Sequence, residues 1–377
     1  MSKLTFRNNE SPTIGVEIEL QMVDAETFAL RSSIETVLEQ IRSREDCQPF
    51  EDKVKPELMQ SYMELNTGVC KTVREAGDDL RATLSAVESV TDSLGLKLLW
   101  SATHPFSSWR EQEITENPRY HQLVNLMQDI ALRLVTFGLH VHVGVDTGDK
   151  AVMICDRMLR HLPLLLALSS NSPFWEGRDT GLHSNRSKIM EGLPTAGLPH
   201  QMRNWSEYVW LINHLKSTNF INTIREIWWD IRPHNNFGTV EIRICDMPAN
   251  LEQVLSLTAM VQCLVQSISE EIDEGTYQSE YHPMMVAQNK WRATRFGPKA
   301  QLVNNDDYSQ GSVQEVTDRL IDLLTPMGEQ LDCVEELQSA TKLPSNTGSC
   351  QQLKIFEHTN CRTEVVRQMI EANDWRN

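Results

Sequence analysis

The stretch that decides the fold is Ile14-Gly-Val-Glu-Ile-Glu-Leu20, in which apolar and polar residues alternate. Successive side chains of a β-strand point to opposite faces, so Glu17 and Glu19 share one face and the branched residues between them share the other. The alternation therefore predicts a strand over residues 13–23. One of its faces is apolar and belongs to a core, and the other carries carboxylates.

Three further stretches show the same alternation, namely Tyr62-Met-Glu-Leu-Asn66, Leu139-His-Val-His-Val-Gly144 and Thr239-Val-Glu-Ile-Arg-Ile-Cys245. If the four strands join one sheet, its polar face carries Glu17, Glu19, Glu64, His140, His142, Glu241 and Arg243. Carboxylates gathered in this way repel one another unless cations neutralise them. Carboxylate oxygens suit Mg²⁺ or Mn²⁺, and an arginine on the same face suits a phosphoryl group that bridges the metals.

The composition restricts the possible partners of the chain. Its 377 residues carry a formal charge of −17, which argues against binding to nucleic acid or an anionic membrane as the main function. No apolar run approaches the roughly 20 residues of a membrane helix, and the first nine residues do not have the pattern of a signal peptide. The eight cysteines form no Cys-x-x-Cys pair, so we expect reduced thiols in a cytoplasmic protein.

The hydrophobic periodicity predicts how the rest of the chain is organised. Helices are expected at 32–44, 73–94, 120–134, 151–169, 205–215 and 251–272, the last with Asn250 as its N-cap. Strands are expected at 58–66, 97–102, 135–145 and 238–246. The Pro- and Gly-rich residues 171–204 indicate a long binding loop, and 285–377 are expected to be helical and acidic. Strands of alternating polarity favour an antiparallel sheet.

Each polar group also has a purely structural interpretation. Glu17 and Glu19 could be the exposed face of an edge strand. His140 and His142 could be hydrogen-bonded side chains beside the core, and Arg243 could simply pair with a neighbouring carboxylate. The recurrence of the pattern in four stretches favours a functional site. The sequence contains no Gly-x-x-x-x-Gly-Lys-Ser/Thr phosphate loop, no Gly-x-Ser-x-Gly elbow and no HExxH zinc motif.

Five motifs, in this order, resemble one known family. They are Ile14-Gly-Val-Glu-Ile-Glu-Leu20, Thr103-His-Pro-Phe106, Gly138-Leu-His-Val-His-Val-Gly144, Asp230-Ile-Arg-Pro233 and Gly238-Thr-Val-Glu-Ile-Arg-Ile-Cys-Asp-Met-Pro248. The family is that of the YbdK-type carboxylate–amine ligases, also called glutamate–cysteine ligase type 2. The resemblance runs from about residue 10 to about residue 300.

The resemblance implies an α+β, glutamine synthetase-like fold, with a curved antiparallel sheet and helices on its convex face. It implies one domain over 1–377, with a catalytic core at 10–300 and a helical C-terminal part at 301–377. The implied cofactors are ATP and Mg²⁺ (or Mn²⁺). In the implied reaction the γ-carboxylate of L-glutamate attacks ATP to give an acyl phosphate, and L-cysteine or another amine then displaces phosphate.

The family roles transfer to particular residues of this chain. The resemblance implies a metal shell of Glu17, Glu19, Glu64, His142 and Glu241. It implies that Arg232 and Arg243 hold the transferring phosphate, and so ATP, or the substrate carboxylate. It implies that the substrate is bound by Arg186, Asn204, Trp205 and His104. The last of these belongs to the Thr103–Phe106 motif. Many relatives carry a further acid where this chain has Ile18, but alternation puts that position on the core face.

Two other functions remain open at this stage. A zinc- or iron-dependent hydrolase or oxygenase could use His140 and His142 with a carboxylate. A non-catalytic relative could bind a nucleotide or an amino acid and regulate another protein. ATP dependence and metal preference distinguish the ligase from the hydrolase. Homodimers are the commonest oligomers of soluble proteins, so a homodimer is the expected oligomeric state.

Overall fold

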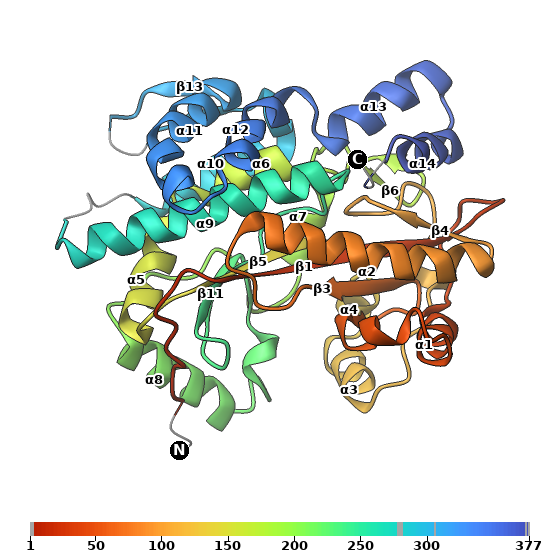
Figure 1. The fold of residues 1–377 in the computed structure, drawn as a ribbon, viewed down its shortest axis with the longest axis horizontal. Coiled ribbons are helices and arrows are strands. Elements are labelled where there is room, and N and C mark those ends of the chain that lie inside the picture. Colours follow the sequence, from red (N-terminus) through yellow and green to blue (C-terminus); the bar gives the residue numbers. More distant parts are fainter. Residues whose placement is uncertain (1–3, 277–281, 305–306, 374, 376–377) are drawn as a thin grey trace.

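The computed structural model describes residues 4–276, 282–304, 307–373 and 375, and an antiparallel sheet lies at its centre (Figure 1). The strand order is β10-β11-β5-β1-β3-β2, and β4 pairs with the far half of β1. The strands are β1 (Ile14–Asp24), β2 (Val54–Pro56), β3 (Tyr62–Asn66), β4 (Leu96–Leu99), β5 (Leu139–Gly144), β10 (Ile231–His234) and β11 (Thr239–Ile242). Every pair in this sheet is antiparallel, which confirms the predicted strand arrangement.

The register of the strands brings the polar positions together. Glu17 of β1 lies opposite His140 of β5, and Glu19 lies opposite Glu64 of β3. His142 in turn lies opposite a residue of β11, Glu241. Residues directly opposite in an antiparallel pair share a face, with their Cβ atoms about 4.5–5.5 Å apart. The four predicted strands therefore do form one sheet with a single polar face.

The opposite face of the sheet is packed against helices. Val16, Ile18 and Leu20 are buried there, so the apolar residue at position 18 leaves the polar face intact, as predicted. Helix α2 (Val73–Ser93) covers β1, β3 and β4, and α9 (Leu251–Asp273) covers β5, as Figure 1 shows. Burying a large aliphatic side chain stabilises the folded state by about 1.5–3 kcal/mol. Burial of these residues is therefore a main reason why β1 keeps its apolar face toward the helices.

Helix α9 is the only helix among the described residues that is long and apolar enough to cross a membrane. Its most apolar window is 83% buried within the protein, and the helix contacts α2, α5 (Gly148–Met158), α11 (Val313–Gln330) and α12 (Val334–Ser339). These contacts identify α9 as a core helix. Its predicted N-cap is confirmed, because the Asn250 side chain accepts a hydrogen bond from the amide of Gln253.

Two helices predicted as continuous are broken in the structure. Residues 120–134 form α3 (Pro118–Met127) and α4 (Asp129–Leu132), separated at Gln128, whose φ of +53° is incompatible with an α-helix. Residues 151–169 form α5 and α6 (Leu162–Ser169), with Pro163 in the first turn of α6. Proline lacks the amide that would continue α5 but is well tolerated at a helix start.

The predicted long loop, 171–204, contains more regular structure than expected. It includes β6 (Phe174–Trp175), β7 (Arg178–Asp179), α7 (Asn185–Met190) and β8 (Ala196–Gly197), and β8 pairs in parallel with β9 (Trp228–Trp229). Buried Asp246, just beyond β11, accepts hydrogen bonds from the hydroxyls of Ser172 at 2.7 Å and Ser184 at 2.9 Å. These bonds tie the segment to the sheet.

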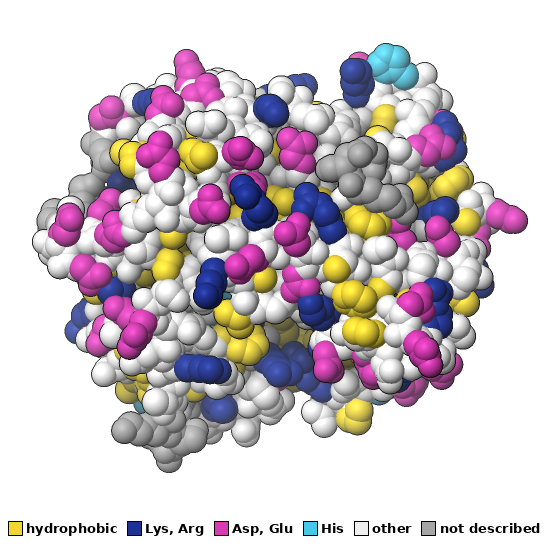
Figure 2. All heavy atoms as spheres, viewed as in Figure 1, with side chains coloured by type: hydrophobic (Ala, Val, Ile, Leu, Met, Phe, Trp, Pro, Cys, Tyr) yellow, Lys and Arg dark blue, Asp and Glu magenta, His cyan; other side chains and the backbone are white. Residues whose placement is uncertain are grey.

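The C-terminal part is mainly helical, as predicted. It contains α10 (Pro283–Phe296), α11, α12, α13 (Gly348–Thr359) and α14 (Arg362–Glu371), and also an unpredicted hairpin of β12 (Gln301–Val303) and β13 (Gln310–Ser312). The remaining α-helices are α1 (Ile34–Ser43) and α8 (Trp205–Ser217). All eight cysteines are free thiols, and six of them are buried. Acidic and basic side chains are interspersed over the face shown in Figure 2.

Candidate active site

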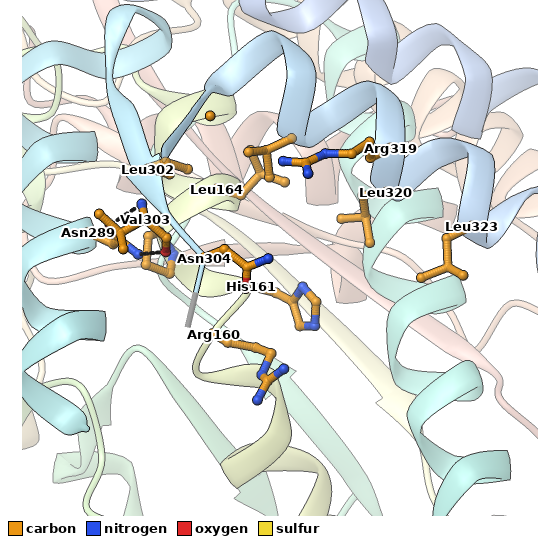
Figure 3. Close-up of a pocket in the computed structure, with 13 residues that line it drawn as sticks. Arg160, His161, Leu164, Asn289, Leu302, Val303, Asn304, Arg319, Leu320 and Leu323 are labelled. Atoms are coloured by element: carbon orange, nitrogen blue, oxygen red, sulfur yellow. Dashed lines mark hydrogen bonds between the residues drawn. The ribbon is translucent and has the colours of Figure 1, made fainter. Parts of the chain in front are cut away.

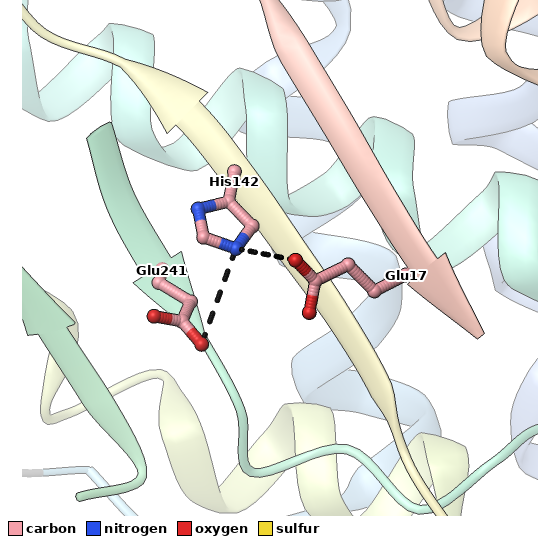
Figure 4. Close-up of side chains that lie close together, drawn as sticks. All are labelled: Glu17, His142 and Glu241. Carbon is pink, nitrogen blue, oxygen red and sulfur yellow. Dashed lines mark ion pairs between the residues drawn. The ribbon is translucent and has the colours of Figure 1, made fainter. Parts of the chain in front are cut away.

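The site is built around Glu17, which lies between two histidines of β5. The Glu17 carboxylate is 3.2 Å from Nδ1 of His140 through one oxygen and 3.2 Å from Nε2 of His142 through the other. The same Nε2 atom is 4.0 Å from the carboxylate of Glu241, and Figure 4 shows the His142 ring between the two glutamates. Glu64 approaches the same group, because ligand atoms of Glu17, Glu64 and His140 lie within 4.8 Å of one another.

These five residues, Glu17, Glu64, His140, His142 and Glu241, are called the carboxylate–imidazole cluster below. Their donor atoms suit a divalent cation. The Nε2 atom of His140 is buried and has no hydrogen-bond partner among the described residues, whereas that of His142 faces the Glu17 carboxylate at 3.2 Å. A buried polar atom without a partner is costly, and a metal ion would satisfy a ring nitrogen that the protein leaves unpaired. The Nδ1 atom of His142 is held by the hydroxyl of Thr239 at 2.9 Å, which fixes the ring orientation.

The pKa shifts of the acidic residues in and beside the cluster indicate that the site lacks positive charge. Burial and the neighbouring Glu17 raise the pKa of Glu64 well above its ordinary value. Burial and nearby Glu19 raise the pKa of Glu57 to about 7. Burial also opposes ionisation of Glu17, but His142 and His140 outweigh it and lower the pKa of that carboxyl. A bound cation would stabilise the ionised form of these neighbouring carboxyl groups, so the site suits metal binding.

Two arginines hold Glu241 in place. Arg232 donates from Nε to one carboxylate oxygen of Glu241 at 2.7 Å and from Nη2 to the other at 3.2 Å. Its Nη1 atom donates to the carbonyls of Ile227 and Ile224. Arg243 also pairs with Glu241. Burial acts against the charge of Glu241, yet Arg232, Arg243 and His142 hold the pKa of this carboxyl well below its usual range.

Arg186 of α7 lies beside the start of β5, the strand that carries the histidines. Its guanidinium covers Gly138, where an added Cβ would stand 2.2 Å from Nη2, so only glycine leaves room for it. Its Nη atoms donate to the carbonyls of Ile244 and Arg243 at 3.4 and 3.3 Å. Its Nε atom is buried and has no partner within the described chain. The amide of Gly138 donates to Glu19, so Arg186 lies close to that carboxylate.

A cavity of about 100 Å³ adjoins the cluster. The charged side chains and the histidine that line it come from six separate segments and are Glu19, Glu57, Arg119, His140, Arg186 and Arg243. Its other walls include the apolar side chains of Leu123, Leu134, Met190 and Trp228. Carboxylates and guanidinium groups thus line the same cavity, so metal ligands and cations that can bind an anionic group adjoin each other there.

Three residues assigned to the substrate lie elsewhere. Buried His104 accepts from the amide of Ser107 at 2.9 Å and contacts the carbonyl of Phe28 at 3.0 Å, so it joins two turns. Burial lowers the pKa of its ring to about 3. Asn204 is the N-cap of α8, and Trp205 stacks on a neighbour within that helix, Tyr208. The structure does not bring these three residues to the described lining of the cavity.

Sequence reasoning misses two charged residues that line the cavity, Glu57 and Arg119, and leaves a third lining residue, His140, outside the implied metal shell. The two-residue spacing of His140 from His142 puts both on one face. Glu57 follows β2, which at three residues is too short to show alternation. Arg119 is in the first turn of α3, and its position depends on how that helix packs.

Comparisons with known proteins agree on one family. The sequence model of glutamate-cysteine ligase family 2 (GCS2) matches residues 13–372, so the similarity continues well beyond residue 300, the expected end of the resemblance. A protein of Gloeobacter violaceus named "Putative glutamate--cysteine ligase 2" is 39% identical over 367 residues, covering 97% of this chain and 98% of the relative. One of Frankia alni named "Putative glutamate--cysteine ligase 2-1" is 42% identical over 338 residues, covering 89% and 87%.

Solved structures share the fold at low sequence identity. The crystal structure of the glutamate–cysteine ligase of Francisella tularensis in complex with AMP matches with a TM-score of 0.70 and 13% identity, covering 97% of this chain and 89% of that one. A bifunctional glutathione synthetase from Pasteurella multocida matches with a TM-score of 0.67 and 15% identity, covering 96% and 52%. The predicted α+β fold with a large antiparallel sheet, of the glutamine synthetase-like kind, is thus confirmed.

Proposed function

The chain belongs to glutamate–cysteine ligase family 2, and we propose that it is an ATP-dependent ligase that joins the γ-carboxylate of L-glutamate to an amine. The observation that carries the proposal is the register of β1, β5 and β11. This register gathers the carboxylate–imidazole cluster, in which the Nε2 atom of His140 has no hydrogen-bond partner among the described residues, beside a cavity lined by Arg186 and Arg243. Metal ligands and guanidinium groups facing one cavity are what phosphoryl transfer requires.

The metal ligands in this proposal are the five cluster residues, with Glu19 and Glu57 on the cavity side. Mg²⁺ or Mn²⁺ bound there would neutralise the phosphates of ATP and align them for transfer. His140, which belongs to a motif but not to the metal shell that the resemblance implies, joins the proposed ligands because its Nε2 atom is unpaired among the described residues. Glu57 joins them because it lines the same cavity as Glu19, and burial and the Glu19 carboxylate together raise its pKa to about 7.

In the proposed reaction, an oxygen of the γ-carboxylate attacks the γ-phosphorus of ATP, and ADP leaves. The amine then attacks the acyl carbon, phosphate leaves, and the nitrogen loses a proton. Arg243 lies between the cluster and the cavity, where negative charge would develop during transfer. Arg232 uses most of its donors on Glu241 and two carbonyls, so we assign it as a positioning residue and not as a phosphate ligand.

Arg186 is the proposed ligand for a carboxylate of glutamate. Its Nε atom lacks a partner among the described residues, and its side chain lines the cavity. Cysteine is the proposed amine by family, and other primary amines satisfy the same chemistry. Location in the cytoplasm and assembly into a homodimer stay predictions.

The proposal is tested by measuring ADP release from ATP and L-glutamate with a panel of amines that includes L-cysteine. Mass spectrometry identifies any γ-glutamyl product, and each reaction is run with Mg²⁺ and with Mn²⁺. We expect release that requires both glutamate and one amine. Glu17→Gln and Glu241→Gln should each reduce it at least 100-fold, because they remove charge from the metal site, about 3 kcal/mol in the barrier.

The matched control is Glu35→Gln, a change of an exposed glutamate in the first turn of α1 that should leave turnover unaltered. Full activity of both cluster variants would refute the assigned metal shell. Absence of ADP release with every pair of substrates would refute the ligase. Bound zinc or iron in the purified protein would then favour the His-x-His hydrolase or oxygenase.

A further inference from the structure

A second cavity, of about 300 Å³, lies in the C-terminal part of the molecule (Figure 3). It is enclosed by the start of α6, by α10, by the β12–β13 hairpin and by α11. None of its lining residues lines the cavity beside the carboxylate–imidazole cluster. Cavities that hold small molecules measure about 300–1,000 Å³, so this one suits a ligand at the small end of that range.

The lining has an unusual balance of charge for an acidic protein. It contains Arg160, His161 and Arg319, and no Asp or Glu occurs among its described residues, although the chain as a whole carries a charge of −17. Arginine side chains in a concave site favour an anionic ligand. In Figure 3 the His161 ring points into the middle of the cavity.

Arg319 is the side chain best placed to bind such a ligand. Its Nε atom donates to the carbonyl of Glu315, one turn earlier in α11, and its terminal nitrogens make no other hydrogen bond within the described chain. The carboxylate of Glu315 is already engaged in a capping box, accepting from the amide and the hydroxyl of Ser312 at 2.8 Å each. A guanidinium with two unused nitrogens can bind a carboxylate or phosphate through paired hydrogen bonds.

The rest of the lining is apolar. Leu164, Leu302 and Leu320 are buried around the cavity, and Leu323 stands at its edge with 74% of its surface exposed. Small-molecule sites typically combine an apolar lining with a few polar groups that orient the ligand. We propose that this cavity binds a small organic anion, with its charged group on Arg319 and its apolar body against these leucines.

The test uses a matched series of fluorinated probes and the full chain. The probes are 4-(trifluoromethyl)phenylacetate, 4-(trifluoromethyl)phenyl phosphate, 4-(trifluoromethyl)benzyl alcohol and 4-(trifluoromethyl)benzylamine. They share one apolar body and differ in the charge of the head group. Fluorine NMR line broadening gives the dissociation constants. We expect one or both anions to bind at least 10-fold more tightly than the alcohol and the amine, and the preferred anion identifies the head group.

Two variants locate the binding. Arg319→Glu should weaken anion binding at least 10-fold, and Leu323→Ser should weaken it by a smaller factor; both side chains are exposed, so the fold should be retained. Arg74→Glu makes the same charge change on an exposed position of α2 and should have no effect. Equal binding of all head groups, or the same loss in Arg319→Glu and Arg74→Glu, would overturn the proposal.

Discussion

Glu241 shows how single residues determine this site. Only 1% of its surface is exposed, and a buried carboxylate is tolerated only when cations and hydrogen-bond donors surround it. Arg232 supplies a two-point contact from the adjacent strand, and Arg243 supplies a second cation two residues along. The same arrangement keeps Glu241 ionised and aimed at His142, as a metal ligand must be.

Replacing Arg232 should therefore be costly to the fold. In Arg232→Met the buried Glu241 loses its two-point partner, and the carbonyls of Ile224 and Ile227 lose their donor. We expect the free energy of unfolding in urea to fall by about 3–5 kcal/mol, as for other broken buried pairs.

The matched control for this prediction is an exposed ion pair. Arg31 pairs with Asp24, and the two side chains are 50% and 29% exposed. Arg31→Met should change the free energy of unfolding by less than about 1 kcal/mol. Equal effects of Arg232→Met and Arg31→Met would contradict the account of Glu241 given above.

At the scale of secondary-structure elements, the contact between α5 and the segment before α8 contains a perturbed acid. Burial raises the pKa of Asp156 in α5 from 3.8 to about 7, despite a hydrogen bond from the amide of Met202. Between about pH 4 and 7 the native state binds a proton that the unfolded state has released. The stability that Asp156 contributes is therefore full below about pH 4 and is lost as the pH rises through 7.

Substituting this acid should remove that pH dependence. Asp156→Asn keeps an oxygen that can accept from Met202 but cannot ionise. We expect the stability of the variant, relative to the unaltered protein, to increase as the pH is raised from 4 to 8. Urea unfolding at several pH values measures the difference, in which contributions from all other groups cancel. A difference that is constant over this range would contradict the assignment.

At the scale of the whole molecule, the C-terminal part is bound to the sheet domain through buried contacts. Helices α11 and α12 pack on α9, and Gln352 of α13 donates to the Ser101 hydroxyl at 2.9 Å and to the Asn171 side chain at 2.7 Å. Ser349 donates from its amide to the carbonyl of Ser170. All these residues are buried, so removing residues 301–377 would expose apolar surface and unpaired polar groups.

We therefore predict that the chain folds as one cooperative unit. A fragment ending at residue 300 should be insoluble or lack a cooperative unfolding transition. The full chain serves as the control, and its unfolding followed by circular dichroism and by tryptophan fluorescence should give coincident curves. A soluble fragment with the same transition as the sheet domain of the full chain would show that 10–300 is an independent domain.

The sequence by itself determined the strands, their polar face and the identity of most cluster residues. Alternation is a local property with a period of two, so within each strand Glu17 and Glu19, or His140 and His142, could be assigned to one face, whereas the face shared by different strands depended on their joining one sheet. The family motifs extended this to the α+β fold and to the ligase family. The starts of the helices at Asn250 and Val73 could also be predicted from neighbouring residues alone, because caps and periodicity are visible within one or two turns.

Only the tertiary structure decided which residues surround the cavity. Glu57 and Arg119 reach it from a short edge strand and a helix start, and their positions depend on packing between distant segments. His104, Asn204 and Trp205 belong to recognisable motifs or loops, yet hydrogen bonds and stacking hold them elsewhere. Local pattern fixes the face on which a side chain lies, whereas the register and packing of the whole sheet fix the atoms that it meets.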